Sequence, residues 1–419
     1  MGLLKPEMLL IIVSSIIILS FLFNGISKKT NIPSVLMLIA LGLGIRYIIL
    51  SNTDQELNFF PILEVLGVVG LIMIVLEAAL ELELKKEKLL PILKSLTIAL
   101  LSLLASAYIA SQILLYFIPE MTLISAWLYA TPLSILSSAI IIPSVQTLKE
   151  DKREFHIYES TFSDILGIIL FYFLTAKLDV ESSHGFVEFS GSFLLTMLVS
   201  VLASYLIIVV FQRIKSNVKL FLLIAVLLLL YGIGKIQHLS SLIIILIFGL
   251  VIANMRLFFR GPLSKFLDFK KAHHIYNELH TITAETAFVV RTFFFVIFGI
   301  TISISSLFSS SVVLVSLMII LSIYIIRYVL LRVFLGKDIL PQVFIAPRGL
   351  ITILLFYNIP VEAEIANFEP GILLFVIIAT SLIMTGALIF DKKRHSKAIK
   401  EAQSQDVVIS YRNESKHEK

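Results

Sequence analysis

Residues 158–174 read YESTFSDILGIILFYFL, and this stretch decides the class of fold. Its second half is apolar throughout, and the whole stretch approaches the ~20 residues that an α-helix needs to cross a bilayer. Glu159 and Asp164 nevertheless lie inside it. A carboxylate within a membrane-spanning helix is costly, so each of the two is a candidate functional residue or half of a buried ion pair.

The rest of the chain is equally apolar. Of its 419 residues, 58% are hydrophobic and 15% are charged, and the mean hydropathy is +0.98. Soluble domains carry ~25% charged residues, and a soluble protein this apolar would lack the polar surface to cover its core. We therefore expect an all-α polytopic membrane protein. The absence of cysteine excludes disulfides and thiolate chemistry.

Thirteen apolar segments have the length of membrane spans. They run roughly over 8–23, 32–50, 60–82, 91–117, 122–147, 157–175, 189–211, 218–234, 238–254, 282–304, 311–334, 340–358 and 369–390.

These segments predict one membrane domain over residues 1–390. Within it, the basic loop 255–281 fits an amphipathic helix on the inner leaflet as well as an ordinary cytoplasmic linker. Residues 391–419 are charged and few, which predicts a disordered cytoplasmic tail.

The loops alternate in charge along the chain. Loops after odd-numbered spans are basic, as Lys28 and Lys29 illustrate, and most others are acidic or nearly uncharged, with Lys235 as an exception. The positive-inside rule then places the N-terminus outside and the C-terminus in the cytoplasm. The compact loops and short tail favour a prokaryotic plasma (inner) membrane.

Asp164 is the first candidate for ion binding. Ser163 beside it offers a further oxygen, and hard cations prefer oxygen ligands, while a single carboxylate can hold either a proton or a small cation. The alternative is a carboxylate that is simply paired with an arginine.

Glu159 lies five residues earlier and about 140° around the helix, so it faces a different neighbour. A permanent arginine partner suits it, because a buried carboxylate without one would be protonated or very costly. Arg348, in IAPRGLITILLFY, is the candidate partner.

Other ionisable residues also fall within spans. Glu77, in LIMIVLEAALELEL, either lines a cation path or lies near the cytoplasmic interface. We expect Glu285 and Arg291, six residues apart, to serve structural pairs, and Arg327 to be structural too. His156 and the other histidines near cytoplasmic ends are interpreted as interfacial residues, with pH sensing as the alternative.

Two spans carry signs of interruption. The fifth reads WLYATPLSILSSAIIIPSV and holds Pro132, Ser137, Ser138 and Pro143. In the twelfth, Pro347 precedes Arg348 and Gly349. Interrupted helices at matching places in two halves mark the binding site of many secondary transporters, although a proline can also be only a kink.

Several classes of function are disfavoured. The chain has no Walker A sequence, metal-ligand cluster or nucleophile elbow, which argues against a P-loop pump and against an enzyme. The net charge of +5 resides mostly in loops and tail, so it indicates topology and not nucleic-acid binding.

Together these segments resemble the monovalent cation/proton antiporter superfamily, on its sodium/hydrogen exchanger side, over roughly residues 8–390. Glu159 and Ser160 match the start of the family's Glu-Ser…Asn-Asp signature, and Asp164 matches its ion-binding aspartate. LEAALELEL resembles the third-helix motif, with Glu77 at its glutamate, and PRGLITI resembles the late Arg-Gly motif. RTFFFVIFGI, which begins at Arg291, and NIPSVLMLIALGLGI resemble the tenth and second helices.

The resemblance implies inverted repeats, a core bundle and a dimerisation bundle, broken crossing helices, and a homodimer among membrane lipids. It implies exchange of a monovalent cation for H⁺ by alternating access, with Na⁺ first and K⁺ or Li⁺ as alternatives, and without a cofactor. The implied ion and proton ligands are Asp164, Ser163, Ser137 and Ser138. Glu159 and Arg348 would form a structural ion pair, with Glu77 and Arg291 as accessory charges. Because Ser163 cannot carry a second proton, exchange would be electroneutral.

Two departures from the family pattern keep alternatives open. Ser163 stands where the family has Asn, and Ala139, Ile140 and Ile141 stand where it has Thr-Asp-Pro. One alternative is a cation channel or uniporter, which would show ion flux without proton counterflow. The other is a non-transporting membrane sensor or scaffold on the same fold.

Overall fold

In the described part of the computed structural model, helices are the only regular secondary structure, and no strand occurs there. The structure describes residues 6–392 except 31, 53–59, 83, 85, 147, 179–184, 215–218, 237–240, 260–264, 266, 302–306, 308 and 367. The α-helices are α1 Pro6–Thr30, α2 Ser34–Asn52, α3 Phe60–Glu81, α4 Leu89–Phe117, α5 Leu123–Ser134, α6 Ser138–Ser144, α7 Glu150–Ala176, α8 Gly185–Phe211, α9 Lys219–Ile236, α10 Ser241–Ala253, α11 Met255–Phe258, α12 Phe269–Thr301, α13 Ser310–Leu335 and α14 Leu350–Phe356. A last helix spans Gly371–Lys392. Short 3₁₀ turns cover η1 Lys86–Lys88, η4 Gln342–Phe344 and η5 Val361–Ala363.

Helices of membrane-spanning length and composition recur along the chain. Eight of those in the described part are long and apolar enough to cross a bilayer, and three shorter apolar helices lie among them. This confirms an all-helical, multi-pass fold. The exact count of thirteen spans stays a prediction.

The domain boundaries can be compared with the helices only in part. Within the predicted linker 255–281, residues 255–258 form α11 and α12 begins at Phe269, so the second half of that range is the start of a long helix. Residues 393–419 of the predicted tail lie outside the described residues.

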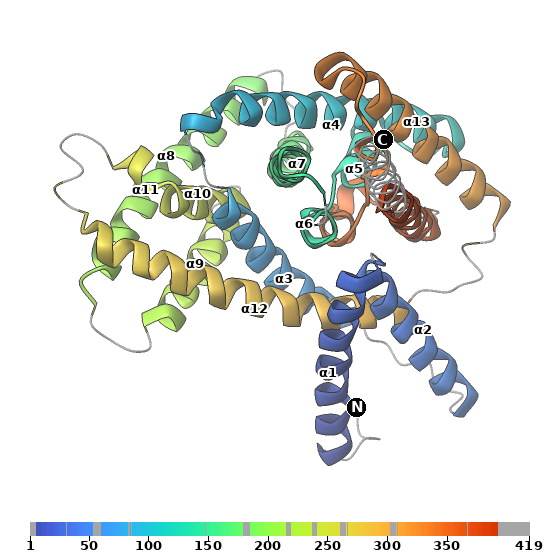
Figure 1. Cartoon of the computed structure of the whole chain (residues 1–419), viewed down its shortest axis with the longest axis horizontal. Coiled ribbons are helices and arrows are strands. Elements are labelled where there is room, and N and C mark those ends of the chain that lie inside the picture. The colour runs from blue at the N-terminus through green and yellow to red at the C-terminus, as the bar shows by residue number, and fades with distance from the viewer. Residues whose placement is uncertain are drawn as a thin grey trace, which may run out of the picture.

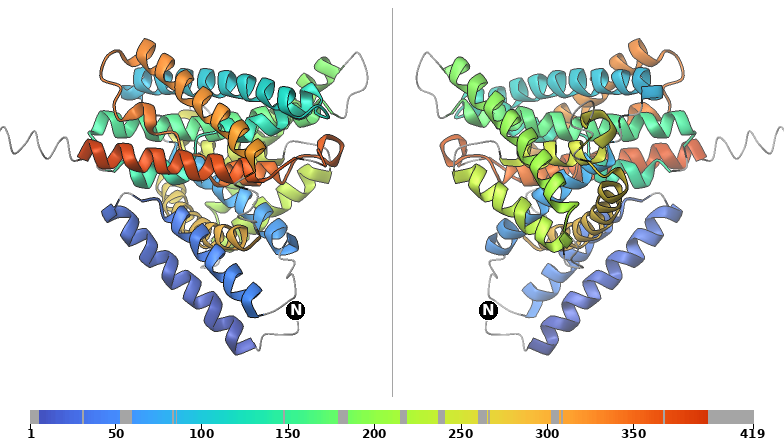
Figure 2. Two further views of the ribbon diagram at one scale, coloured as in Figure 1. Left: turned by 90° about the vertical axis from the view of Figure 1, so that its right-hand side faces the viewer. Right: turned by 90° about the vertical axis from the view of Figure 1, so that its left-hand side faces the viewer.

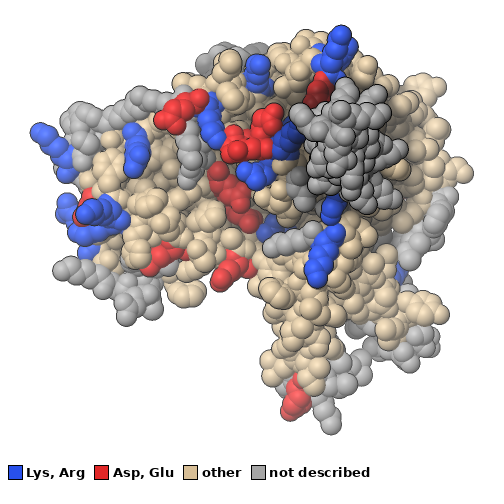
Figure 3. Space-filling model, viewed as in Figure 1, with Lys and Arg blue, Asp and Glu red and all other residues tan. Residues whose placement is uncertain are grey.

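The helix α7 runs through the middle of the molecule, viewed end-on in Figure 1. It packs against α3, α4, α5, α6, α10 and α14. On one side α4 contacts α13, and on the other α10 contacts α8 and α3, while α12 crosses α2 and α3. The views in Figure 2 show α1 and α2 reaching away from this bundle. Near the middle of the face seen in Figure 3, acidic and basic side chains intermingle, whereas most of that face is uncharged.

The fifth and twelfth spans are both interrupted, as predicted. Between α5 and α6 the backbone of Ile135 and Ser137 is extended, and the twelfth span has a non-helical stretch between η4 and α14. The two interruptions meet: the Ser137 N–H donates to Pro347 O at 3.0 Å. Gly349 lies so close to Ser137 that a Cβ there would come within 2.3 Å of its Oγ.

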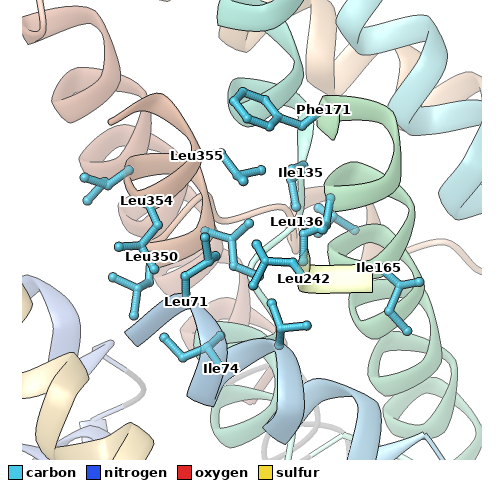
Figure 4. Close-up of a cluster of buried hydrophobic side chains, with 14 of the residues drawn as sticks. Leu71, Ile74, Ile135, Leu136, Ile165, Phe171, Leu242, Leu350, Leu354 and Leu355 are labelled. Carbon is cyan, nitrogen blue, oxygen red and sulfur yellow. The ribbon is translucent and has the colours of Figure 1, made fainter. Parts of the chain in front are cut away.

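Apolar side chains pack tightly around this crossing. Figure 4 shows Leu71 and Ile74 of α3, Leu350 and Leu354 of α14, and Ile135 of the fifth span gathered together. All five are at most 4% exposed. The crossing is therefore enclosed by protein, which is the condition under which non-helical backbone is tolerated at membrane depth.

Candidate functional site

Asp164 lies on α7 beside the interruption of the fifth span. Its side chain is wholly buried. One oxygen, Oδ2, accepts a hydrogen bond from the Ser138 N–H at 3.4 Å, and the other, Oδ1, has no hydrogen-bond partner in the described part of the chain. A bare carboxylate in this environment is costly. Uptake of a proton or of a small cation removes that cost, so the arrangement suits a group that alternates between the two.

The three candidate serines take different places around Asp164. Ser163 Oγ accepts the Leu136 N–H at 2.9 Å, so it holds the non-helical segment against α7 and keeps one lone pair for a ligand. Ser138 provides the backbone contact to Asp164 described above. Ser137 lies against Gly349 on the crossing. The structure thus brings the Ser138 backbone to Asp164, holds Ser163 Oγ against Leu136, and places Ser137 where the fifth span contacts the twelfth.

Glu159 forms a buried ion pair, but not with the residue that the sequence suggested. Its Oε1 accepts from Arg327 Nη1 at 2.8 Å and its Oε2 from Nη2 at 3.2 Å. Arg327 also donates to Val343 O and Gln342 O. The prediction that Arg348 is the partner is therefore wrong. Arg327, on α13, presents both nitrogens of its planar guanidinium to the carboxylate, the geometry that makes such pairs strong.

A third residue, His156, completes this cluster. It is fully buried, not interfacial as predicted, and its Nδ1 lies 3.1 Å from Glu159 Oε2. Because a carboxylate only accepts, Nδ1 must carry the proton. The other nitrogen, Nε2, has no partner in the described part. The spacing of three residues from Glu159 on one helix was the sequence feature that could have revealed this contact.

Arg348 instead holds the interruptions together. Its Nε donates to Leu133 O at 2.7 Å and its Nη1 to Ala346 O at 3.1 Å. Leu133 belongs to the last turn of α5, whose carbonyls lack helical partners. A cation at that end of a helix is favourable, so Arg348 stabilises the broken fifth span from the broken twelfth.

Glu77 and Arg291 form an ion pair at the edge of the site. Arg291 Nη2 lies 3.3 Å from Glu77 Oε1, linking α12 to α3. Both side chains line a cavity of about 150 Å³, together with Glu81 and Ser138. Both residues were predicted from the sequence to be accessory charges, but no sequence feature indicated that they pair with each other.

The three residues of the fifth span that depart from the family pattern, residues 139–141, lie at packing contacts. Ala139 lines the same cavity. Ile140 is 2% exposed and Ile141 is fully buried, and Ile140 lies against Gly349. At these positions α6 contributes apolar packing to the crossing, and Asp164 is the carboxylate beside it.

Comparisons with known proteins agree with this architecture. A family model described as "Sodium/hydrogen exchanger, transmembrane" matches residues 13–390. The solved structure of the sodium proton antiporter MjNhaP1 from Methanocaldococcus jannaschii at pH 8 is similar, with a TM-score of 0.65 and 19% identity over 92% of this chain and 99% of that one. A second structure of MjNhaP1, from an electron-microscopy map, gives a TM-score of 0.60 at 19% identity over 94% of this chain and 97% of that one. No curated protein sequence matches the chain significantly.

Proposed function

The chain belongs to the sodium/hydrogen exchanger family, and from that premise we propose that it exchanges Na⁺ for H⁺ at Asp164 by alternating access, with K⁺ and Li⁺ as the alternative cations. Membership makes it a multi-pass cation/proton transporter and not an enzyme. The observation that carries the finer proposal is the buried Asp164 carboxylate, whose Oδ1 has no hydrogen-bond partner in the described structure, beside two interrupted helices.

Competition for one carboxylate couples the two fluxes. A cation that binds Asp164 displaces its proton, and a proton that returns displaces the cation. Ser163 precedes Asp164 on α7 and Ser138 contacts it through its backbone N–H, so their hydroxyls are the neighbouring oxygens that we propose as ligands. Such oxygens suit a hard monovalent cation. During the transport cycle Asp164 is accessible first from one side of the membrane and then from the other.

The charge of the site sets the stoichiometry. Protonated Asp164 is neutral, and Asp164 with one monovalent cation is also neutral, so the charge that moves is the same in both directions. Ser163 adds no second proton. We therefore infer one-for-one, electroneutral exchange.

We propose that the interrupted helices belong to the part of the protein that moves during transport. Arg348 ties α5 to the twelfth span, and Arg327 ties Glu159 of α7 to α13 and η4. These contacts keep the Asp164 segment in one shape while it moves relative to its neighbours. This motion and the homodimer are proposals that follow from the family. The plasma-membrane location and the cytoplasmic C-terminus are proposals too, and the loop charges support the orientation.

The test uses purified protein in liposomes with a preset pH gradient. Na⁺, Li⁺ and K⁺ are added separately between about pH 6 and 9, because a carboxyl that exchanges protons with a cation must titrate near the working pH. We expect at least one cation to dissipate the gradient, at a rate that does not change when valinomycin clamps the membrane potential. A rate that follows the potential would reject electroneutrality, and cation flux without proton movement would identify a channel or uniporter.

A non-transporting sensor or scaffold is the second candidate, and Ile140 is the observation that favours it. This buried isoleucine stands in the fifth span where the family carries an aspartate. The same liposomes discriminate the two: no response to any of the three cations would support the scaffold. A response would show that exchange occurs although position 140 carries no carboxylate.

A further inference from the structure

Glu81 is a carboxylate that the proposed exchange at Asp164 does not use. It ends α3 and lies one helical turn beyond Glu77, about 6 Å along the same face. Both glutamates line the cavity of about 150 Å³, together with Asn24, Ser34, Arg291 and Ser138. These residues come from five helices, so the cavity lies where α1, α2, α3, α6 and α12 meet.

The charges of this cavity do not cancel. Arg291 is paired with Glu77 at 3.3 Å, which leaves that pair neutral. Glu81 is partly exposed and lines the same cavity, where Arg291 attracts its carboxylate and Glu77 repels it. The described lining therefore carries two carboxylates and one guanidinium, a net charge of −1 when all are ionised.

The cavity is also directly connected to Asp164. Ser138 lines it, and the Ser138 N–H is the donor to Asp164 Oδ2. The fully buried, unpartnered Oδ1 of Asp164 thus lies one residue behind the cavity wall. A cation that enters the cavity reaches the last polar group before the buried carboxylate.

We propose that Glu81 determines the apparent cation affinity of the transporter by concentrating hydrated monovalent cations in this cavity. The proposal rests on exchange at Asp164, and Glu81 acts on the approach to that site without being a ligand in it. The physical basis is that a charge among low-dielectric walls focuses the field and raises the local counter-ion concentration. Arg291 pairs with Glu77, so Glu81 is the second carboxylate that leaves the lining net negative when both are ionised.

Glu81→Gln removes this charge and keeps the shape of the side chain. At about pH 9, so that Glu81 is ionised, and at about 0.01 M ionic strength, where the Debye length is ~30 Å, we expect the cation concentration for half-maximal exchange to rise about three- to tenfold, a modest part of the range that such fields produce. The maximal rate should stay within about twofold, because the Asp164 site is intact. Glu81→Asp keeps the charge and should remain near wild type.

Salt supplies the second readout. Adding an impermeant organic cation to about 0.15 M shortens the Debye length to ~8 Å and should bring wild type and Glu81→Gln together. Glu87→Gln is the matched control, since it removes the same charge from an exposed residue of η1 outside the cavity lining. It should leave the half-maximal concentration unchanged.

Equilibrium binding of ²²Na⁺ to the purified protein separates this inference from the exchange itself. If wild type exchanges no cation, the exchange proposal fails, while tighter ²²Na⁺ binding by wild type than by Glu81→Gln at low ionic strength still supports the role of Glu81. If exchange is present, unchanged half-saturation and unchanged binding in Glu81→Gln would overturn the Glu81 inference alone. The Glu81 inference would also be overturned if the half-maximal cation concentration shifted equally at low and high salt, or if Glu87→Gln produced the same shift.

Discussion

Glu159 of α7 and Arg327 of α13 face each other through two hydrogen bonds of 2.8 and 3.2 Å, although 168 residues separate them in sequence. Both side chains are at most 1% exposed. The pair joins the helix that carries Asp164 to the helix that precedes the broken twelfth span. It therefore fixes where Asp164 stands relative to the crossing.

Removing Arg327 alone should destabilise the protein strongly. Arg327→Met leaves a buried carboxylate without its main partner, and breaking one side of such a pair costs about 3–5 kcal/mol. Glu159→Leu combined with Arg327→Met should recover part of this loss, because an apolar pair of similar volume avoids the buried charge. Thermal unfolding in detergent measures both variants.

The same unfolding series distinguishes Arg327 from Arg348. Effects of residues in contact couple, whereas those of separate sites add. Arg348→Met should therefore add to Glu159→Leu without coupling. A strong coupling of Glu159 to Arg348, and none to Arg327, would contradict the pairing described here.

His156 should be replaceable by a side chain that keeps a donor at the Nδ1 position. His156→Asn retains an N–H near that place, whereas His156→Leu removes the hydrogen bond to Glu159 Oε2. Hydrogen bonds to charged groups contribute about 1.5–3 kcal/mol. We expect the melting temperature to fall less for His156→Asn than for His156→Leu, and equal losses would argue that His156 acts only by filling space.

Gly42 and Gly299 should not tolerate a side chain. A Cβ at Gly42 would lie 2.2 Å from Val296 O, and one at Gly299 would lie 2.5 Å from Ile39 O, where α2 crosses α12. Gly42→Ala should lower stability by about 1–3 kcal/mol, as overpacking does. Gly44→Ala is the control on the same helix, because nothing lies within 4 Å of its added Cβ. Equal melting temperatures for the two variants would reject the close crossing.

Gly349→Ala should impair exchange more than stability. Its Cβ would come within 2.3 Å of Ser137 Oγ and 3.1 Å of Ile140 Cδ1, at the contact between the two interruptions. Separating them would displace the segment that contacts Asp164. We expect the maximal exchange rate to fall about tenfold or more, since small misplacements near a reacting group have large effects on rate. Gly386→Ala, with nothing within 4 Å, should exchange like wild type.

Much of the fold could be predicted because it depends on local sequence. Apolar length marks the helices, and prolines 132, 143 and 347 mark the two interrupted spans, which is where the structure has them. The partners of buried charges could not be predicted in this way. Arg327 and Arg348 both lie in apolar spans, and only packing decides which of them reaches Glu159.

The candidate site shows the same limit. Asp164 stood out because a carboxylate within a span is costly, and the structure adds that its Oδ1 has no hydrogen-bond partner in the described part. Which serine contacts it depends on how α6 begins after the non-helical segment, a tertiary feature. The pairing of Glu77 with Arg291, and the position of Glu81 beside that pair, depend on how α3 packs against α12.

The most direct test of the central claim is Asp164→Asn in liposomes, with proton flux and ²²Na⁺ flux recorded on the same preparation. The amide keeps the shape of the side chain but can hold neither the charge nor the exchanged proton. We predict that both fluxes disappear together while the melting temperature is kept or raised, because a buried unpaired carboxylate has been removed. Coupled fluxes that persist in Asp164→Asn, or the loss of one flux without the other, would contradict the claim that Asp164 carries both ions.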